Sequence, residues 1–99
     1  MKNGYNIHWT DNALKELEHT IEYLINNFTE KEIKKLALEI EYTIALVSQN
    51  PNIYPRSDKK GIHKAVILRY NSLYYRVKEN NIEILSFFSN RQHPKKRKL

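Results

Sequence analysis

Hydrophobic side chains recur along the chain with two different spacings, and these spacings outline the fold. Residues 5–9 alternate apolar and polar side chains, which is typical of a half-buried strand. Thr10 then offers an N-cap hydroxyl, and over residues 11–27 the apolar positions recur every three or four residues, which predicts a helix with Ile21 at the centre of its buried stripe. This stripe consists of Leu14, Leu17, Ile21, Leu24 and Phe28.

A second helical stripe follows after a short connection. Thr29-Glu30-Lys31-Glu32 has the pattern of a capping box, in which the Thr29 hydroxyl accepts from the Glu32 amide. Apolar residues then recur at helical spacing from Ile33 to Val47, and Asn50-Pro51 ends the helix. Two amphipathic helices joined in this way predict a helical hairpin that needs a sheet to cover its apolar side.

Three strands are predicted after a loop at residues 51–61, over residues 62–70, 73–79 and 82–88. Asn71-Ser72 and Asn80-Asn81 separate them, and both are read as hairpin turns because Asn tolerates positive φ. The resulting register places on one apolar face Val66, Leu68, Tyr70, Leu73, Tyr75, Val77, Ile84, Ser86 and Phe88. It places on the opposite face Ala65, Ile67, Arg69, Tyr74, Arg76, Lys78, Glu83, Leu85 and Phe87. We therefore expect an α+β fold of order β-α-α-β-β-β, with the helical hairpin packed on an antiparallel sheet.

Composition and charge narrow the functional classes. The chain of 99 residues has no cysteine, which excludes disulfides, thiolate metal sites and cysteine nucleophiles. The histidines lack the spacing of metal ligands, so we expect no metal and no cofactor. No signal peptide and no membrane span are visible, so we expect a cytoplasmic protein without a membrane partner. The net charge is −3 over residues 1–50 and +9 over residues 51–99, which suggests either a polyanionic or acidic partner or simply a solvated basic surface.

The order of elements and several short segments resemble the RelE/ParE superfamily, the toxins of bacterial type II toxin–antitoxin modules. The resemblance rests on the start Trp9-Thr10-Asp11-Asn12-Ala13, on the helix end at 46–51, on the strands 73–77 and 82–88, and on Asn90-Arg91-Gln92-His93-Pro94. It implies one toxin domain over residues 1–94 followed by a basic tail over residues 95–99. It also implies a growth-inhibiting toxin that a cognate antitoxin neutralises.

Two targets divide this superfamily: RelE-like toxins cut mRNA on the ribosome, and ParE-like toxins poison DNA gyrase. Metal-free RNA cleavage needs an acid–base pair and cations around the phosphate. The candidates for these roles are Arg69, Arg76, Arg91, His93 and Lys64. No tyrosine follows Tyr75 and basic residues are sparse in the strands, so the chain looks closer to the ParE-like branch. Whether it is an enzyme stays open, and a non-toxic nucleic-acid-binding module is a third reading.

A binding surface is expected on the non-core side of the sheet and in the C-terminal segment. Its predicted members are Arg69, Tyr74, Arg76, Lys78, Phe87, Arg91, Lys95, Lys96, Arg97 and Lys98. Cations interleaved with aromatic rings suit an acidic, partly disordered antitoxin or a nucleic acid. For His63 and His93 a plain surface position is the alternative to a role in a site.

Overall fold

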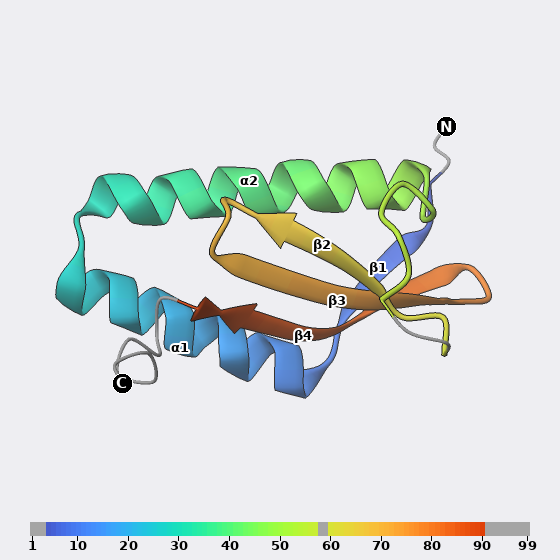
Figure 1. Ribbon diagram of the computed structural model, residues 1–99, viewed down its shortest axis with the longest axis horizontal. Coiled ribbons are helices and arrows are strands. Elements are labelled where there is room, and N and C mark those ends of the chain that lie inside the picture. The colour runs from blue at the N-terminus through green and yellow to red at the C-terminus, as the bar shows by residue number, and fades with distance from the viewer. Residues whose placement is uncertain (1–3, 58–59, 91–99) are drawn as a thin grey trace.

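The chain forms a four-stranded sheet with two helices on one side. A computed structural model describes residues 4–57 and 60–90. The elements are β1 (Asn6–Trp9), α1 (Asp11–Asn27), α2 (Glu30–Gln49), β2 (His63–Ile67), β3 (Asn71–Lys78) and β4 (Asn81–Ser89). The sheet order is β1-β4-β3-β2, as Figure 1 shows. This confirms the β-α-α-β-β-β order, but β1 runs parallel to β4, so the sheet is mixed rather than purely antiparallel.

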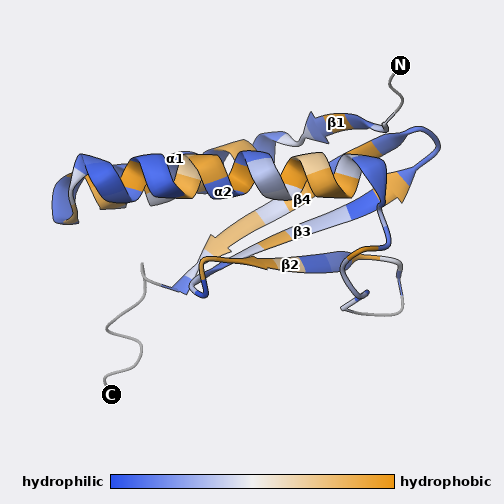
Figure 2. Cartoon of the chain, turned by 90° about the horizontal axis from the view of Figure 1, so that it is seen from above, coloured by the Kyte–Doolittle hydropathy of each residue, from blue (hydrophilic) through white to orange (hydrophobic). Residues whose placement is uncertain are grey.

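Both helices pack on the same face of the sheet (Figure 2), and no helix within the described residues covers the other face. The core between the layers contains Ala13, Leu24, Leu36, Ile40, Val47, Ala65, Ile67, Leu73, Tyr75, Ile82, Ile84 and Phe87. Removing this apolar surface from water is the main force that holds the helices to the sheet. The opposite face of the sheet is therefore available to solvent and partners.

Helix α1 begins as predicted but buries a different stripe. The Thr10 hydroxyl accepts from the Ala13 amide at 3.3 Å, which confirms the N-cap. Leu14 and Phe28 are about two fifths exposed, whereas Thr20 and Leu24 are buried. The predicted stripe is confirmed at Leu17, which packs against the core, and at Leu24. It is wrong at both ends and at its centre, where Ile21 is only partly buried, because it counted only apolar residues and left out Thr20. The Thr20 hydroxyl donates to the Glu16 carbonyl at 3.1 Å, which lets a polar side chain enter the core.

The capping box predicted for α2 does not form. Thr29 is the N-cap residue, but its side chain makes no capping hydrogen bond. The Glu32 amide donates instead to the Thr29 backbone carbonyl at 3.0 Å. The helix therefore starts where predicted, with a different hydrogen bond at its first turn.

The turn between β2 and β3 lies at residues 68–70, not at Asn71-Ser72. Leu68 and Arg69 take positive φ angles of 50° and 67°. Asn71, which was predicted to make the turn, is buried, and its side-chain amide donates to the Ile67 carbonyl at 3.0 Å. A buried asparagine needs such a partner, so Asn71 closes the hairpin from inside the sheet.

This change of register exchanges the two faces of β2. Ala65 pairs with Leu73, and Ala65 and Ile67 are 0% and 2% exposed, while Val66 is 56% exposed. The prediction had placed Val66 in the core and Ala65 and Ile67 outside. Side chains alternate along a strand, so a slip by an odd number of residues moves the whole strand's pattern to the other face.

A β-bulge reverses the pattern in the second half of β4. Tyr75 pairs with Ile84 and Tyr74 pairs with Ser86, which leaves Leu85 as the extra residue. After the bulge Phe87 faces the core and is 1% exposed, while Phe88 is 40% exposed. The placement of Phe87 on the outer face was therefore wrong.

Candidate functional site

The uncovered face of the sheet holds most of the described residues that were predicted to bind a partner. Alternation along the strands places on this outer face His8, Lys64, Val66, Ser72, Tyr74, Arg76, Lys78, Glu83 and Phe88. The outer face thus combines three strong cations with exposed apolar and aromatic groups.

Lys64 and Tyr74 meet at the centre of this outer face. They pair directly across β2 and β3, and the Lys64 Nζ lies 6.0 Å from the centroid of the Tyr74 ring. This distance is at the outer limit of a cation–π contact. The tyrosine ring keeps the lysine stem against the sheet, and the ammonium group stays in solvent.

Arg76 and Glu83 form the ion pair of the outer face. They are register partners on β3 and β4, and Arg76 Nε donates to Glu83 Oε1 at 2.8 Å. The hydrogen bond from Arg76 lowers the pKa of Glu83, and the positive charges of Arg76, Lys78 and His8 lower it further. Glu83 is therefore a carboxylate at neutral pH and does not act as a proton donor.

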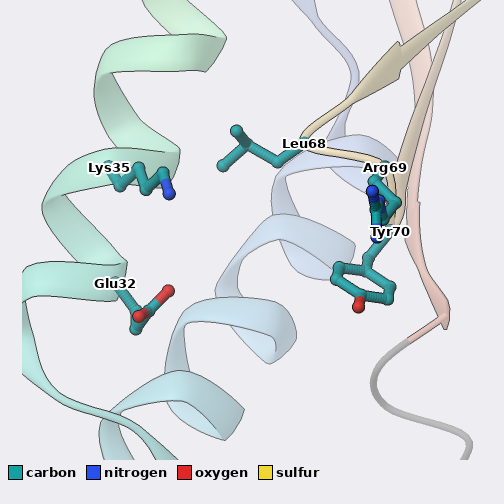
Figure 3. A pocket seen from close by; sticks show the side chains of 5 residues that line it. All are labelled: Glu32, Lys35, Leu68, Arg69 and Tyr70. Atoms are coloured by element: carbon teal, nitrogen blue, oxygen red, sulfur yellow. The ribbon is translucent and has the colours of Figure 1, made fainter.

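The structure places Arg69 away from Tyr74 and Arg76, which corrects the prediction that they share a face. Arg69 lies in the β2–β3 turn, where it lines an open pocket of about 320 Å³. Figure 3 shows Arg69 and Tyr70 extending from the turn, with Glu32 and Lys35 entering from α2. Arg69 is thus part of the helix side of the molecule at the tip of the hairpin.

Other predicted site residues divide into two groups. Phe87 is in the core and is not available to a partner. Arg91, His93, Lys95, Lys96, Arg97 and Lys98 lie outside the described residues. The residues that the structure brings together on the outer face are therefore Lys64, Tyr74, Arg76 and Lys78.

Sequence reasoning missed the contacts of Glu16 and Arg56, and the plain surface position that it weighed for His63 is wrong because this residue is buried. Glu16 of α1 accepts from the Phe87 amide at 2.9 Å and from the Ser86 hydroxyl at 2.7 Å, next to the part of β4 that β1 does not pair. His63 is buried, and Arg56 bridges to it from the loop before β2. Glu16 sits on the polar side of its helix in the sequence pattern, and only the packing of α1 along β4 explains its role.

Across residues 4–57 and 60–90, no group of three His, Asp or Glu side chains comes together as a metal site. No helix in these two ranges has the length and apolar composition to cross a membrane.

Solved structures share this fold. The chromosomal ParDE toxin–antitoxin system from P. aeruginosa gives a TM-score of 0.72 at 22% identity, covering 86% of this chain and 95% of that chain. The YoeB dimer from Staphylococcus aureus gives a TM-score of 0.60 at 21% identity, covering 85% of this chain and 94% of that chain. A conserved hypothetical protein from Helicobacter pylori gives a TM-score of 0.57 at 16% identity, covering 88% of this chain and 96% of that chain. At these identities the likeness concerns the fold alone.

Sequence comparison then connects this fold to a family. No curated protein matches the chain. A family profile does match it over residues 7–94, and its description reads "ParE toxin of type II toxin-antitoxin system, parDE". The match spans β1, both helices and the whole sheet, and agrees with the resemblance to the RelE/ParE superfamily. The chain therefore belongs to the ParE toxin family of type II toxin–antitoxin systems.

Proposed function

We propose that this toxin acts by binding DNA gyrase, not by cutting RNA, and that a cognate antitoxin neutralises it in the cytoplasm. One observation carries the choice of target: the composition of the outer face. Lys64, Tyr74 and Arg76 stand there beside exposed Val66 and Phe88. Exposed aromatic, aliphatic and arginine side chains are the common constituents of protein-binding surfaces.

The same face offers little for RNA cleavage among its described residues. Cleavage needs one group that takes the 2′-OH proton and another that protonates the leaving oxygen. Glu83 is held as a carboxylate by Arg76, and this ion pair also occupies one N–H group of the arginine. His8 on β1 lies beside Glu83 of β4, and two strands, β4 and β3, separate it from Lys64 on β2. These positions favour contact with a protein over catalysis.

The experiment compares both targets with one protein preparation. Purified toxin is added to a gyrase supercoiling assay and, separately, to a cell-free translation reaction read by primer extension. We expect inhibited supercoiling and no new mRNA ends. Ribosome-dependent cuts with normal supercoiling would overturn the proposal in favour of the RelE-like alternative. If neither reaction changes, a nucleic-acid-binding module without toxicity becomes the better explanation.

The antitoxin contact is proposed for the outer face together with the basic residues Lys95, Lys96, Arg97 and Lys98. The P. aeruginosa structure is that of a ParDE toxin–antitoxin system, which supports an antitoxin partner for this chain. Arg76 and Lys78 are exposed and face the same side, so an acidic peptide can lie across them. Arg69 lies in the β2–β3 turn on the helix side and is not part of this surface.

Charge reversal tests the contact with a matched control. Arg76→Glu combined with Lys78→Glu is expected to weaken antitoxin binding at least about tenfold, because like charges then face the acidic segment. Lys15→Glu on the exposed side of α1 is the control and is expected to leave the affinity unchanged. Equal affinities of the double variant and the native protein, measured by titration calorimetry, would contradict docking on the outer face.

A further inference from the structure

A second pocket lies at the end of β2 opposite to the β2–β3 turn. It has a volume of about 450 Å³ and is formed where the loop before β2 folds against β1 and β3. Its lining consists of Tyr5, Pro51, Asn52, Arg56, Gly61, His63 and Val77. Arg56 carries the only fixed charge among these residues, and none of them belongs to the surface proposed for the antitoxin.

His63 is held rigidly in the wall of this pocket. The residue is 6% exposed, and its ring stacks on Tyr75 with centroids 4.9 Å apart and an angle of 8° between the planes. Its Nδ1 lies 2.8 Å from the Tyr54 carbonyl oxygen. A carbonyl only accepts, so Nδ1 carries the hydrogen and donates it. In the neutral ring the bare nitrogen is therefore Nε2, which has no hydrogen-bond partner among the described residues.

Arg56 is brought to the same place by the backbone. It forms an isolated antiparallel bridge with His63, and residues opposite each other in such a pair project on the same side. The Lys64 amide donates to the Pro55 carbonyl at 3.2 Å, and the Ser57 amide donates to the Ile62 carbonyl at 2.7 Å. Arg56 makes no ion pair with a carboxylate of residues 4–57 or 60–90.

We propose that this pocket binds an oxyanion, a carboxylate or a phosphate group, between the Arg56 guanidinium and His63 Nε2. The guanidinium presents parallel N–H groups that match two oxygens of such an anion. The imidazole takes one proton from solvent onto Nε2, which then donates to the anion while Nδ1 keeps its bond to Tyr54. Pro51 and Val77 form the apolar part of the pocket wall.

The affinity of the pocket for an anion is expected to depend on pH. An anion seated against Nε2 is favoured by the protonated ring, so binding takes up a proton. The other titratable or charged groups at the site are Arg56 and Tyr54 from the loop, Tyr5 ahead of β1 and Tyr75 of β3, and no described carboxylate lines the pocket. Affinity therefore falls as the pH rises, by up to tenfold per pH unit where the free ring is neutral.

The test uses inorganic phosphate and N-acetylglutamate amide as two probes, followed by NMR of the histidine ring nitrogens. We expect either probe to shift the His63 Nε2 signal toward the protonated position. The glutamate amide, whose carboxylate stays ionised over this range, is expected to bind at least about tenfold tighter at pH 6 than at pH 8. Tighter binding of phosphate points to a phosphorylated small molecule as the natural ligand. Tighter binding of the glutamate amide points to an acidic side chain of a protein. The absence of any His63 response to both probes overturns the proposal.

Four variants distinguish specific binding by Arg56 and His63 from a general effect of positive charge on anion binding. Arg56→Gln removes the guanidinium group. His63→Asn keeps a donor for the Tyr54 carbonyl but removes Nε2. Each variant is expected to bind the anion at least about tenfold more weakly. His63→Gln places an amide that donates without titrating, so binding is retained and its pH dependence is lost. Arg69→Gln is the control and leaves binding unchanged. If His63→Asn does not fold, as judged by circular dichroism, Arg56→Gln still decides, and unaltered binding in that variant contradicts the site.

Discussion

The two faces of β3 carry neighbouring residues of one strand into opposite environments. Leu73 and Tyr75 point toward the helices and are 1% and 0% exposed. Tyr74 and Arg76 point away from the helices, and Arg76 is exposed. Packing therefore specifies the covered face, because every atom there has fixed neighbours. The outer face is free to carry cations and aromatic rings, because few of its contacts contribute to stability.

The largest loss of stability is expected when a buried side chain on the covered face of the sheet is truncated. Phe87→Ala is expected to lower the free energy of unfolding by about 3–5 kcal/mol, because it leaves a cavity in the core beneath α1. Phe88→Ala on the outer side of the same strand is the control and is expected to cost far less. Denaturant titration followed by circular dichroism measures both. Similar losses for the two variants would contradict the β-bulge at Leu85.

The junction between the two layers is tested at Glu16. Its carboxylate accepts from the Phe87 amide and the Ser86 hydroxyl, so Glu16→Ala is expected to cost about 2 kcal/mol. Glu16→Gln keeps an acceptor oxygen and is expected to lose less. Glu18→Ala on the exposed side of α1 serves as the control with little change. A loss of the same size at Glu18 would show that removing a negative charge from α1, and not losing the hydrogen bonds from Ser86 and Phe87, accounts for the effect.

The buried hydroxyl of Tyr75 on the covered face of the sheet is expected to make a smaller contribution to stability. The hydroxyl donates to the Pro51 carbonyl at 2.7 Å, so Tyr75→Phe is expected to cost about 1 kcal/mol near neutral pH. Burial raises the pKa of Tyr75 from its ordinary 10.0 to about 12 in the folded protein. The folded state thus keeps a proton that the unfolded chain loses, so this contribution is complete below about pH 10 and is lost between about pH 10 and 12.

Alkaline unfolding measures this contribution. The native protein and Tyr75→Phe are compared by denaturant titration at pH 9 and pH 11. The native protein is expected to lose more stability over this interval than the variant does. Tyr74→Phe, from the outer face, is expected to behave like the native protein. Parallel losses in the native protein and Tyr75→Phe would mean that another group accounts for the alkaline sensitivity.

The smallest effect on stability is expected on the outer face. Arg76→Gln removes the ion pair with Glu83, which is largely screened by solvent, so the unfolding midpoint near neutral pH is expected to change little. Arg76 lowers the pKa of Glu83, so the pair's contribution is present above the ordinary carboxyl pKa and is lost as the pH falls through the folded value. The same variant is expected to reduce antitoxin affinity, and a stability loss as large as that of Phe87→Ala would contradict this division of roles.

Sequence reasoning recovered much of the fold but little of the site. The two helices and the order of strands follow from hydrophobic spacing, and the Thr10 cap follows from local chemistry. The candidate residues Arg69 and Phe87 were misplaced because turn position and the β-bulge decide which way a strand residue points. The contacts of Glu16 and His63 could not be predicted, because their partners are far away along the chain or are backbone carbonyls in a loop.

The sequence by itself determined the element order, the helical hairpin and the membership of a toxin superfamily, because these depend on periodicity and short motifs that each segment carries alone. Only the tertiary structure decided the register of β2, the parallel pairing of β1 with β4 and the burial of Asn71. Each of these depends on a contact between segments that compete for the same hydrogen bonds and the same core volume. That competition is settled only when all layers pack together.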